Sequence, residues 1–556
     1  MRYRSKKRCI KNRLQKSKEI NMKKKLKKIN MKKKSKEINM KKKFNISGPC
    51  ISNMHYMISP QSRCVNVENI VYEHEYFVIH AARQSGKTTL LIDLVNRLNE
   101  EGKCYAICCS LESVQANDTP KQGIQAILSG LQHAIDVHPK INYKELLRNK
   151  DLSEYTVLLK RSLNYFCMKL DKPLVILFDE IDCLSNETLI SFLSQIRDGY
   201  VNRSTVPFVH SIGLIGTRNI RDYIREDCDT PGSAIPFNIV TEVFTLNNFT
   251  FNETKALLAQ HTKQTKQIFS YTVAKKLYDY TQGQPWLVNA VVREILVNIL
   301  KLDITIKIKP THVKKAVQTI IKRRDTHISN VLEHLNENRV QRILTPVITG
   351  DTVGFDMTDD DYQYVMDLGL IRTDRGKITI SNPIYEDVII SKLSSAPQMA
   401  MDSNELLPEL THYLRNKKIQ MKKLLTDFQD FWRENSSIWI KKYQYEEAAP
   451  HLVLLAFLQR FLSHRGTISR ELSSGRGCLD LCIHYKQHKY PIEIIIRRNT
   501  KIIDQGKNQL WNYMDSHYCE TGWLIVFETR KTIPWTKRIF WKTTIVKNKR
   551  IHVVGC

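Results

Sequence analysis

The sequence predicts an α/β fold built on a parallel sheet, and two observations lead to this expectation. Short apolar runs have the composition of buried parallel strands, at 76–79, 104–109, 174–178 and 212–215. Between these runs lie stretches with helical spacing of apolar residues, of which 88–99 is the clearest. Strands that alternate with helices are typical of a parallel sheet covered on both faces.

Helices are expected to dominate after about residue 250. Helical spacing is found at 252–261, 271–281 and 286–300. A short helix at 359–369, a hairpin at 371–381 and a closing helix at 383–393 together indicate a winged helix. Residues 394–403 are expected to form a linker.

The last part of the chain predicts a second α/β unit. Helices are expected to about residue 461. Strand-like runs and one further helix follow, with strands at 467–472, 478–485, 490–497 and 523–527 and the helix at 504–517.

Composition points to a cytoplasmic protein without a membrane partner. Apolar residues make up 42% of the 556 residues, which is enough to bury sizeable cores. No apolar run reaches the roughly 18 residues of a membrane span, and no apolar segment follows the basic N-terminus as in a secretory signal. The 13 cysteines lack the paired spacing of a zinc site and are expected to be reduced thiols.

The net charge of +30 is concentrated at the two ends of the chain. Residues 1–43 carry 21 Lys and Arg against Glu19 and Glu37, in a low-complexity repeat that predicts a disordered arm. Residues 401–556 carry 26 Lys and Arg against 15 Asp and Glu. Basic ends of this kind fit contact with nucleic acid, although a lysine-rich tail can also serve solubility alone.

The strongest motif has the spacing of a phosphate-binding loop and runs Ala81-Ala82-Arg83-Gln84-Ser85-Gly86-Lys87-Thr88-Thr89. It lies between an apolar strand and an amphipathic helix, which is the context that such a loop requires. Gly86 allows close approach of a phosphate, Lys87 supplies positive charge, and Thr88 supplies a hydroxyl for Mg²⁺. Alanine replaces the first glycine of the pattern at position 81.

A second strand ends in acids about 90 residues further on. The apolar run 174–178 leads into Asp179 and Glu180. Asp179 is expected to hold the water shell of Mg²⁺, and Glu180 to orient and deprotonate an attacking water. The two motifs together predict an ATP-binding, ATP-hydrolysing protein with ATP and Mg²⁺ as its cofactors.

These residues carry a family resemblance. Residues 55–393 resemble bacterial AAA-like ATP-binding proteins of the STAND-related group, on the segments 80–90, 178–182, 216–223, 283–290 and 382–386. The resemblance implies a sensor at Thr217 and Arg218, with the arginine reading the γ-phosphate, and it implies that Pro285 packs near adenine. It also implies a slow switch, in which nucleotide state reorients the winged helix, and not a motor.

The C-terminal region resembles the PD-(D/E)xK nuclease-like domain, a restriction-endonuclease-like fold, on segments that include 427–434, 445–452 and 479–481. The resemblance implies that Asp480 and Glu493 are the two metal-binding acids. Isoleucine stands at 495, where active members have lysine, and Arg497 lies one pleat too far along the strand to replace it. The resemblance therefore implies a degenerate nuclease.

The expected organisation has six parts: an arm at 1–43, an ATPase core at 44–250, a helical lid at 251–310, a winged helix at 311–395, a linker at 396–424 and a nuclease-like domain at 425–556. Three functions remain open. The first is an ATP-dependent switch that acts on nucleic acid through a basic, inactive nuclease-like module. The others are an ATP-gated scaffold for protein interactions and an active, ATP-regulated nuclease.

Overall fold

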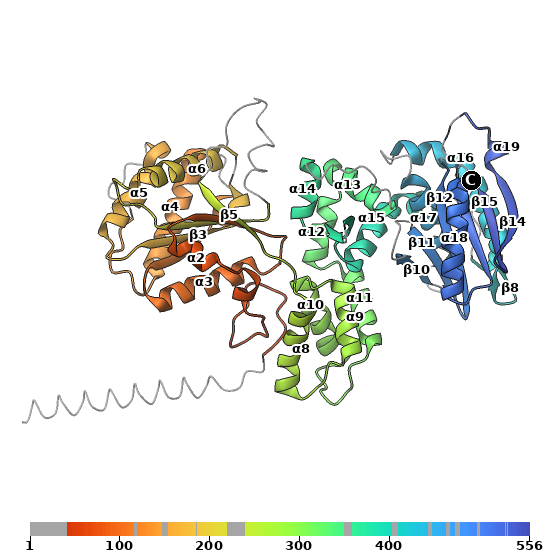
Figure 1. Ribbon diagram of the computed structural model, residues 1–556, viewed down its shortest axis with the longest axis horizontal. Helices are drawn as coiled ribbons and strands as arrows, with labels where there is room; N and C mark the ends of the chain where they lie inside the picture. The colour runs from red at the N-terminus through yellow and green to blue at the C-terminus, as the bar shows by residue number, and fades with distance from the viewer. Residues whose placement is uncertain are drawn as a thin grey trace, which may run out of the picture.

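The fold is described by a computed structural model, which describes residues 42–115, 119–146, 154–184, 186–218, 239–349, 359–374, 376–402, 410–442, 448–462, 467–472, 479–497, 501–528, 530 and 532–556. Three bodies follow one another in Figure 1. A sheet with helices on both faces lies at one end, a helical region lies in the middle, and a second sheet lies at the other end. The predicted arm falls outside the described residues, except for Lys42 and Lys43.

The first sheet has five parallel strands in the order β2-β3-β4-β1-β5. Its strands are β1 (Tyr76–His80), β2 (Tyr105–Ser110), β3 (Leu174–Asp179), β4 (Ser211–Gly216) and β5 (Val240–Thr245). The four predicted strands are confirmed, and β5 is an addition at the edge of the sheet. Because β4 lies between β1 and β3, the ends of all three strands meet at one place.

Helices cover both faces of this sheet, as the alternation of side chains along β1 requires. Phe77 and Ile79 face a core shared with α2 (Val67–Tyr72) and α3 (Lys87–Glu101). Tyr76 and Val78 face the opposite core, which is formed with α4 (Pro120–Val137), α5 (Tyr155–Lys169) and α6 (Asn186–Val201). The short turns η1 (Pro60–Arg63), η2 (Glu112–Val114) and η3 (Ile181–Cys183) complete this part.

The middle of the chain is helical. It comprises α8 (Phe251–Thr265), α9 (Tyr271–Thr281), α10 (Pro285–Arg293), the π-helical turn Glu294–Ile299, α11 (Pro310–Arg323), α12 (Thr326–His334) and α13 (Asn338–Thr349). A capping box starts α8 at Thr250. The Thr250 hydroxyl accepts a hydrogen bond from the Glu253 N–H, and the Glu253 carboxylate accepts one from the Thr250 N–H. The three helices predicted between 252 and 300 are confirmed.

A short helix and a hairpin come next: α14 (Asp360–Asp367), then β6 (Ile371–Asp374) paired antiparallel with β7 (Lys377–Ile380). The helix α15 (Pro383–Asp402) follows the hairpin. The predicted linker at 394–403 is wrong over residues 394–402, which continue α15. Ser394 is fully buried and donates to the Ile390 carbonyl at 2.7 Å, as a residue inside a packed helix does.

The C-terminal body has a mixed six-stranded sheet in the order β10-β11-β12-β13-β15-β14. Its strands are β10 (Thr467–Leu472), β11 (Leu479–Tyr485), β12 (His488–Ile496), β13 (Thr521–Phe527), β14 (Phe540–Val546) and β15 (Lys549–Gly555). The remaining elements are η5 (Leu410–Tyr413), β8 (Leu414–Arg415), β9 (Lys418–Ile419), α16 (Met421–Lys442), α17 (Ala448–Leu462), α18 (Lys501–Ser516) and α19 (Trp535–Arg538).

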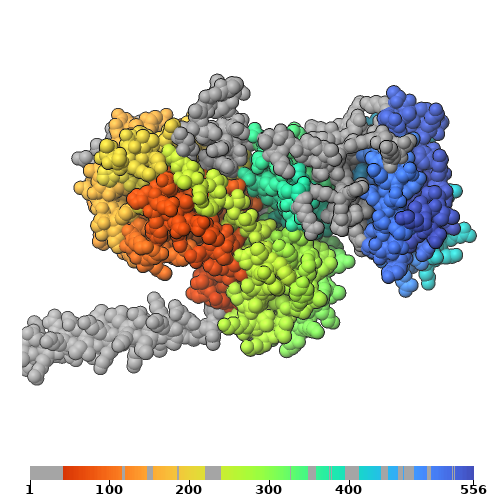
Figure 2. Space-filling model, viewed as in Figure 1, coloured from red at the N-terminus to blue at the C-terminus, as the bar shows by residue number. Residues whose placement is uncertain are grey.

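One face of this second sheet joins a core with α16 and α17, which includes Phe428, Phe457 and Phe527. The other face packs against α18. Figure 2 shows this C-terminal part as a lobe at the opposite end of the molecule from the first sheet. Among the described residues, no helix combines the length and apolarity that a membrane crossing needs.

Candidate nucleotide site and C-terminal acidic site

The loop between β1 and α3 has the backbone geometry of an anion-binding concavity. Gln84 has φ 59° and Gly86 has φ 98°, so left-handed residues alternate with ordinary ones before α3 begins at Lys87. This alternation turns successive N–H groups toward one point. A side chain at 86 would be strained by the positive φ, and its Cβ would lie 3.2 Å from a guanidinium nitrogen of Arg63, which would have to shift.

The ammonium of Lys87 lies at the mouth of this loop. Its Nζ donates to the carbonyl oxygens of Ala81 at 2.6 Å and Ala82 at 3.2 Å. Burial lowers the pKa of Lys87 to about 8, although the nearby carboxylates of Asp182 and Asp179 oppose the shift. The two hydrogen-bond acceptors of Lys87 are neutral carbonyls, so a charged phosphate would be a stronger partner for its ammonium.

The end of β3 brings the two predicted acids to the same place. The Thr88 hydroxyl donates to Asp179 Oδ2 at 2.9 Å, so the hydroxyl and the carboxylate are adjacent oxygen ligands. Burial raises the pKa of Asp179, and burial followed by the charge of Asp179 raises the pKa of Glu180. Ser110, at the end of β2, donates to Glu180 Oε2 at 3.2 Å and fixes the carboxylate at the edge of the sheet.

The predicted sensor pair separates in the structure. Thr217 follows β4, and both its N–H and its hydroxyl donate to Asp182, at 3.1 and 2.8 Å. Thr217 therefore stands between the phosphate loop and the end of β3. Arg218 instead lies over the ring of Tyr364 in α14, with its guanidinium carbon 4.9 Å from the ring centre. In this structure Thr217 lines the cavity at the loop, while Arg218 faces α14.

The lid contributes a turn that only glycine can make. Gly283 has φ 73°, and a Cβ there would lie 1.8 Å from the carbonyl oxygen of Phe249. Gln284 then caps α10 by accepting from the Leu287 N–H at 2.6 Å, and Pro285 occupies the first helical position. This turn places Pro285 at the wall of the cavity.

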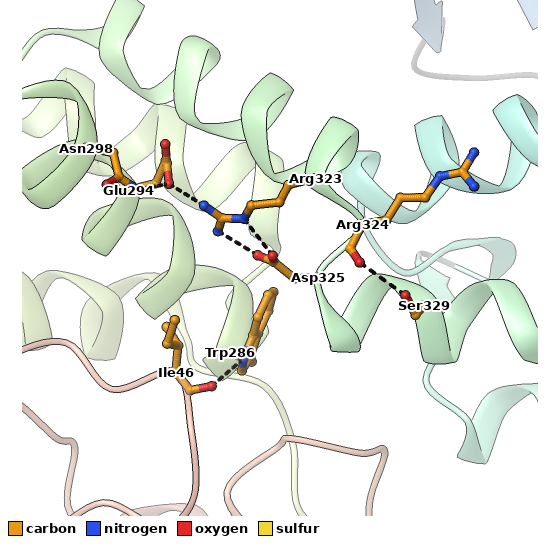
Figure 3. A network of polar contacts seen from close by, with 8 residues as sticks. All are labelled: Ile46, Trp286, Glu294, Asn298, Arg323, Arg324, Asp325 and Ser329. Carbon is orange, nitrogen blue, oxygen red and sulfur yellow. Dashed lines mark hydrogen bonds and ion pairs between the residues drawn. The ribbon is translucent and has the colours of Figure 1, made fainter.

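Trp286 joins the lid to the N-terminal segment, as Figure 3 shows. Its indole N–H reaches the carbonyl of Ile46 at 2.9 Å. On the side of α10 away from Ile46, Arg323 contacts both Glu294 and Asp325, at 3.0 and 2.6 Å, while the guanidinium of Arg324 points away. The Arg323–Glu294 pair links the end of α11 to the π-helical turn that continues α10, and the Arg323–Asp325 pair is local to the end of α11.

These elements surround a cavity of about 600 Å³. Its lining includes the phosphate loop, Asp179, Glu180 and Thr217. The segment 45–50 and residues of α10 also line it. Cys50 holds this segment in place, because its N–H donates to the Thr89 hydroxyl at 3.0 Å. Sequence reasoning missed 45–50, which carries no motif of its own.

Arg63 is a second residue that the sequence did not single out. It is half-buried, and its guanidinium donates to the carbonyl of Ser85 at 2.9 Å and to that of Asn247. The same group lies 4.8 Å from the ring centre of Phe249. Arg63 thus connects the phosphate loop to the chain that enters the lid.

The C-terminal acidic site is of a different kind. Glu493, on β12, is 1% exposed, and its Oε1 has no hydrogen-bond partner within the described part of the chain. Leu481 of β11 pairs with Ile492 of β12, so Asp480 and Glu493 occupy the neighbouring positions on these two adjacent strands. The side chain of Asp480 lies outside the described residues.

Ile495 is 5% exposed and belongs to the apolar core beneath α18, together with Leu524. Arg497 lies 3.9 Å from Glu528 Oε2, and Glu528 is further engaged by Arg530 at 2.7 Å. Position 495, which the sequence resemblance compares with a lysine, is thus apolar and packed. The nearest arginine along the strand is paired with a different acid.

The parallel sheet with β4 inserted between the phosphate-loop strand and the acidic strand defines a P-loop ATPase fold. A family model described as an AAA-like domain matches residues 50–389, which is more than half of the chain. The chain therefore belongs to the AAA-like family. A second family model, described as a domain of unknown function, DUF8371, matches residues 416–531. Among curated protein sequences no match is found.

Solved structures that match part of this chain include the following three proteins. The Walker-type ATPase of Pyrococcus abyssi is 15% identical, with a TM-score of 0.44, over 62% of this chain and 99% of that chain. The Aeropyrum pernix ORC2 protein is 12% identical, with a TM-score of 0.38, over 63% and 97%. The Thermotoga maritima RuvB Holliday junction branch migration motor is 12% identical, with a TM-score of 0.31, over 58% and 90%.

Proposed function

We propose that this protein binds and hydrolyses ATP with Mg²⁺, and that nucleotide state sets how residues 359–381 dock on the phosphate loop. The oxygen donors Thr88 and Asp179 lie 2.9 Å apart and are of the kind that Mg²⁺ takes beside substrate phosphates. They would hold the ion, which neutralises phosphate charge when bound. Glu180 would take the proton of the attacking water, and Lys87 would bind the β- and γ-phosphates.

The observation that carries the switch is the contact between Gly369 and the phosphate loop. Gly369 follows α14 with φ 72°, and a Cβ added to it would lie 2.6 Å from the Cβ of Ala82. Close by, His80 Nδ1 lies 3.4 Å from Asp367 Oδ1. Ala82 is also a carbonyl partner of Lys87. A phosphate that draws Lys87 away from this carbonyl changes the surface on which Gly369 rests.

We further propose that residues 311–395 act as a winged helix and that 425–556 form a degenerate nuclease-like module that contacts nucleic acid. The excess of Lys and Arg in residues 401–556 supports the contact with a polyanion. The mixed sheet with α17 on one face and α18 on the other supports the nuclease-like fold. Ile495, buried where a lysine is needed, supports the loss of cleavage.

DNA binding measured over a range of salt, with ATP, with ADP and without nucleotide, tests this function. We expect the logarithm of the affinity to fall linearly with the logarithm of salt concentration, as counterion release requires. We also expect the ATP and ADP curves to separate, because nucleotide state repositions the docked region. Absence of DNA binding in all three states would remove the nucleic-acid role and favour a scaffold for protein partners.

A further inference from the structure

A second cavity lies between the start of the described chain and the helical region. Its volume is about 310 Å³, and its lining shares no residue with the cavity at the phosphate loop. The lining comes from residues 42–44, Tyr56, α8 with the turn after it, and residues between 293 and 304. This volume lies within the roughly 300–1,000 Å³ that small-molecule sites occupy. The proposed ATP chemistry makes no use of this cavity.

The lining of this second cavity is largely apolar and aromatic. The buried rings of Phe44 and Tyr56 lie 4.8 Å apart between their centres. The ring of His261 lies 5.9 and 5.7 Å from them. Leu302 and Ile304 also line the cavity, yet they are 68% and 45% exposed. Exposed apolar side chains beside an aromatic cavity are typical of a surface that a ligand covers.

Most polar groups of the cavity are already engaged. His261 contacts the Tyr56 hydroxyl through Nδ1 at 3.3 Å and the Gln267 amide oxygen through Nε2 at 3.2 Å. The amide nitrogen of Gln267 donates to the Asp303 carbonyl at 3.3 Å. The Asp303 carboxylate accepts from the N–H and the hydroxyl of Thr305, at 2.9 and 2.6 Å. The one carboxylate of the lining is therefore held by its own loop.

Arg293, the last residue of α10, differs from these groups. It is half-buried and lines the cavity. Within the part of the chain that the structure describes, its guanidinium forms no hydrogen bond or ion pair, although Asp303 lines the same cavity. Its nitrogens are not among the buried atoms that lack a partner, so they remain accessible. Lys42 and Lys43 add further positive charge to the lining. An arginine that is partly removed from water is usually paired with an acid.

We propose that this cavity binds an organic anion, a molecule with an apolar body and a single acidic group. The acidic group pairs with Arg293, whose planar guanidinium matches a carboxylate or a sulfonate. The apolar body covers Phe44 and Leu302 and removes their surface from water. A neutral molecule of the same shape leaves the guanidinium without a counter-ion. The inference does not depend on the proposed ATP site.

The test is a pair of fluorescence titrations of the full chain with anilinonaphthalene sulfonate and with phenylnaphthylamine. The two probes have the same rings, but only the first carries an acidic group. Excess ATP and Mg²⁺ are present, so that neither probe is counted in the nucleotide cavity. We expect saturable binding of the sulfonate to the unaltered protein. Arg293→Met should weaken that binding by about tenfold or more, the size of a hydrogen bond to a charged group, and should leave the affinity for the amine little changed.

Arg197→Met is the matched control. Arg197 lies on α6, is half-buried, lines neither cavity and has no ion pair in the described ranges. We expect it to change neither affinity. Ile304→Glu is a second variant, at a side chain exposed enough for the fold to tolerate the change. Its carboxylate should repel the sulfonate and spare the amine.

Absence of saturable sulfonate binding to the unaltered protein would overturn the inference. So would an equal loss of sulfonate affinity in Arg293→Met and Arg197→Met, because the probe would then respond to positive charge in general. If Arg293→Met loses both probes, the result of Ile304→Glu decides. Selective loss of the sulfonate in that variant supports the site, and unchanged sulfonate affinity contradicts it.

Discussion

The two sheets of this protein each carry acids at strand positions, but the acids have different surroundings. Asp179 ends the buried strand β3 and is itself only 4% exposed, and Glu180 follows it. Both residues line a cavity of about 600 Å³, where the hydroxyls of Thr88 and Ser110 donate to their carboxylates. Glu493 is 1% exposed, on the face of its sheet that α18 covers. Acid type and strand position are therefore poor guides to chemistry. What separates the two sites is the cavity beside the first pair of acids and the hydroxyl donors that hold them.

The largest expected effect is on turnover at the first sheet. In Glu180→Gln the amide keeps the size of the side chain and its contact with Ser110, but it cannot accept the proton of the attacking water. We expect ATP hydrolysis to fall by roughly 10²–10⁴-fold, the usual contribution of a general base, with ATP affinity little changed. Phosphate release and equilibrium binding measure the two quantities, with Glu187→Gln on the exposed side of α6 as the control. Undiminished turnover would show that another group is the base.

Binding itself should depend on Lys87. We expect Lys87→Ala to weaken ATP binding by about 2–5 kcal/mol, the cost of removing one partner from a buried charge pair. Lys103→Ala is the matched control, because Lys103 is 67% exposed and lies just beyond the same helix. Titration of fluorescent ATP measures both variants. An affinity for ATP that Lys87→Ala leaves intact would rule out the phosphate loop as the binding site.

We expect a charged residue at position 495 to destabilise the second sheet. Ile495→Lys would place an ammonium in the core beneath α18, beside Gly506 and Leu524. We expect the free energy of unfolding to fall by about 3–5 kcal/mol, as for an uncompensated buried charge. Ile495→Met, which keeps the site apolar, should cost less than about 1.5 kcal/mol. Denaturant unfolding compares them. If the lysine variant is stable and cleaves DNA, position 495 opens onto a site that needs only the missing cation.

A smaller effect is expected at Gly369, where residues 359–381 contact the phosphate loop. Gly369 and Gly376 both have positive φ, but only a Cβ at 369 would meet a neighbour, the Cβ of Ala82. Alanine at either position incurs the backbone cost of about 1 kcal/mol, and alanine at 369 adds a steric clash. We expect Gly369→Ala to raise hydrogen exchange in 359–381 and to reduce its response to ATP. Equal exchange in the Gly369→Ala and Gly376→Ala variants would argue against docking at this point.

Much of the first sheet could be read from the sequence because its signals are local. The strands at 76–79 and 174–178 are continuous apolar runs, and the phosphate loop has a fixed spacing. The edge strand β5 was missed because it is mostly exposed and has no apolar face to reveal it. The segment 45–50 was missed for another reason. Its place depends on contacts with residues far along the chain, such as Cys50 with Thr89 and Ile46 with Trp286.

In the second sheet, the sequence motif predicted where the acids lie but not which residues surround them. The spacing of Asp480 and Glu493 gave two acids on adjacent strands, and the pairing of Leu481 with Ile492 agrees with that placement. The spacing could not reveal that Arg497 lies near Glu528, since that acid comes 31 positions later. The strands β14 and β15 also escaped prediction. The side chains of β14 are half-buried or exposed, and its apolar residues do not alternate cleanly with polar ones.

The most direct test of the contrast between the two sheets measures both activities in one preparation of the full chain, with ATP, Mg²⁺ or Mn²⁺, and labelled DNA. We expect release of phosphate from ATP that Glu180→Gln abolishes, together with DNA that stays intact under every condition. DNA cleavage that disappears in Asp480→Ala or Glu493→Gln would contradict this expectation, because the acids of the second sheet would then form a working site.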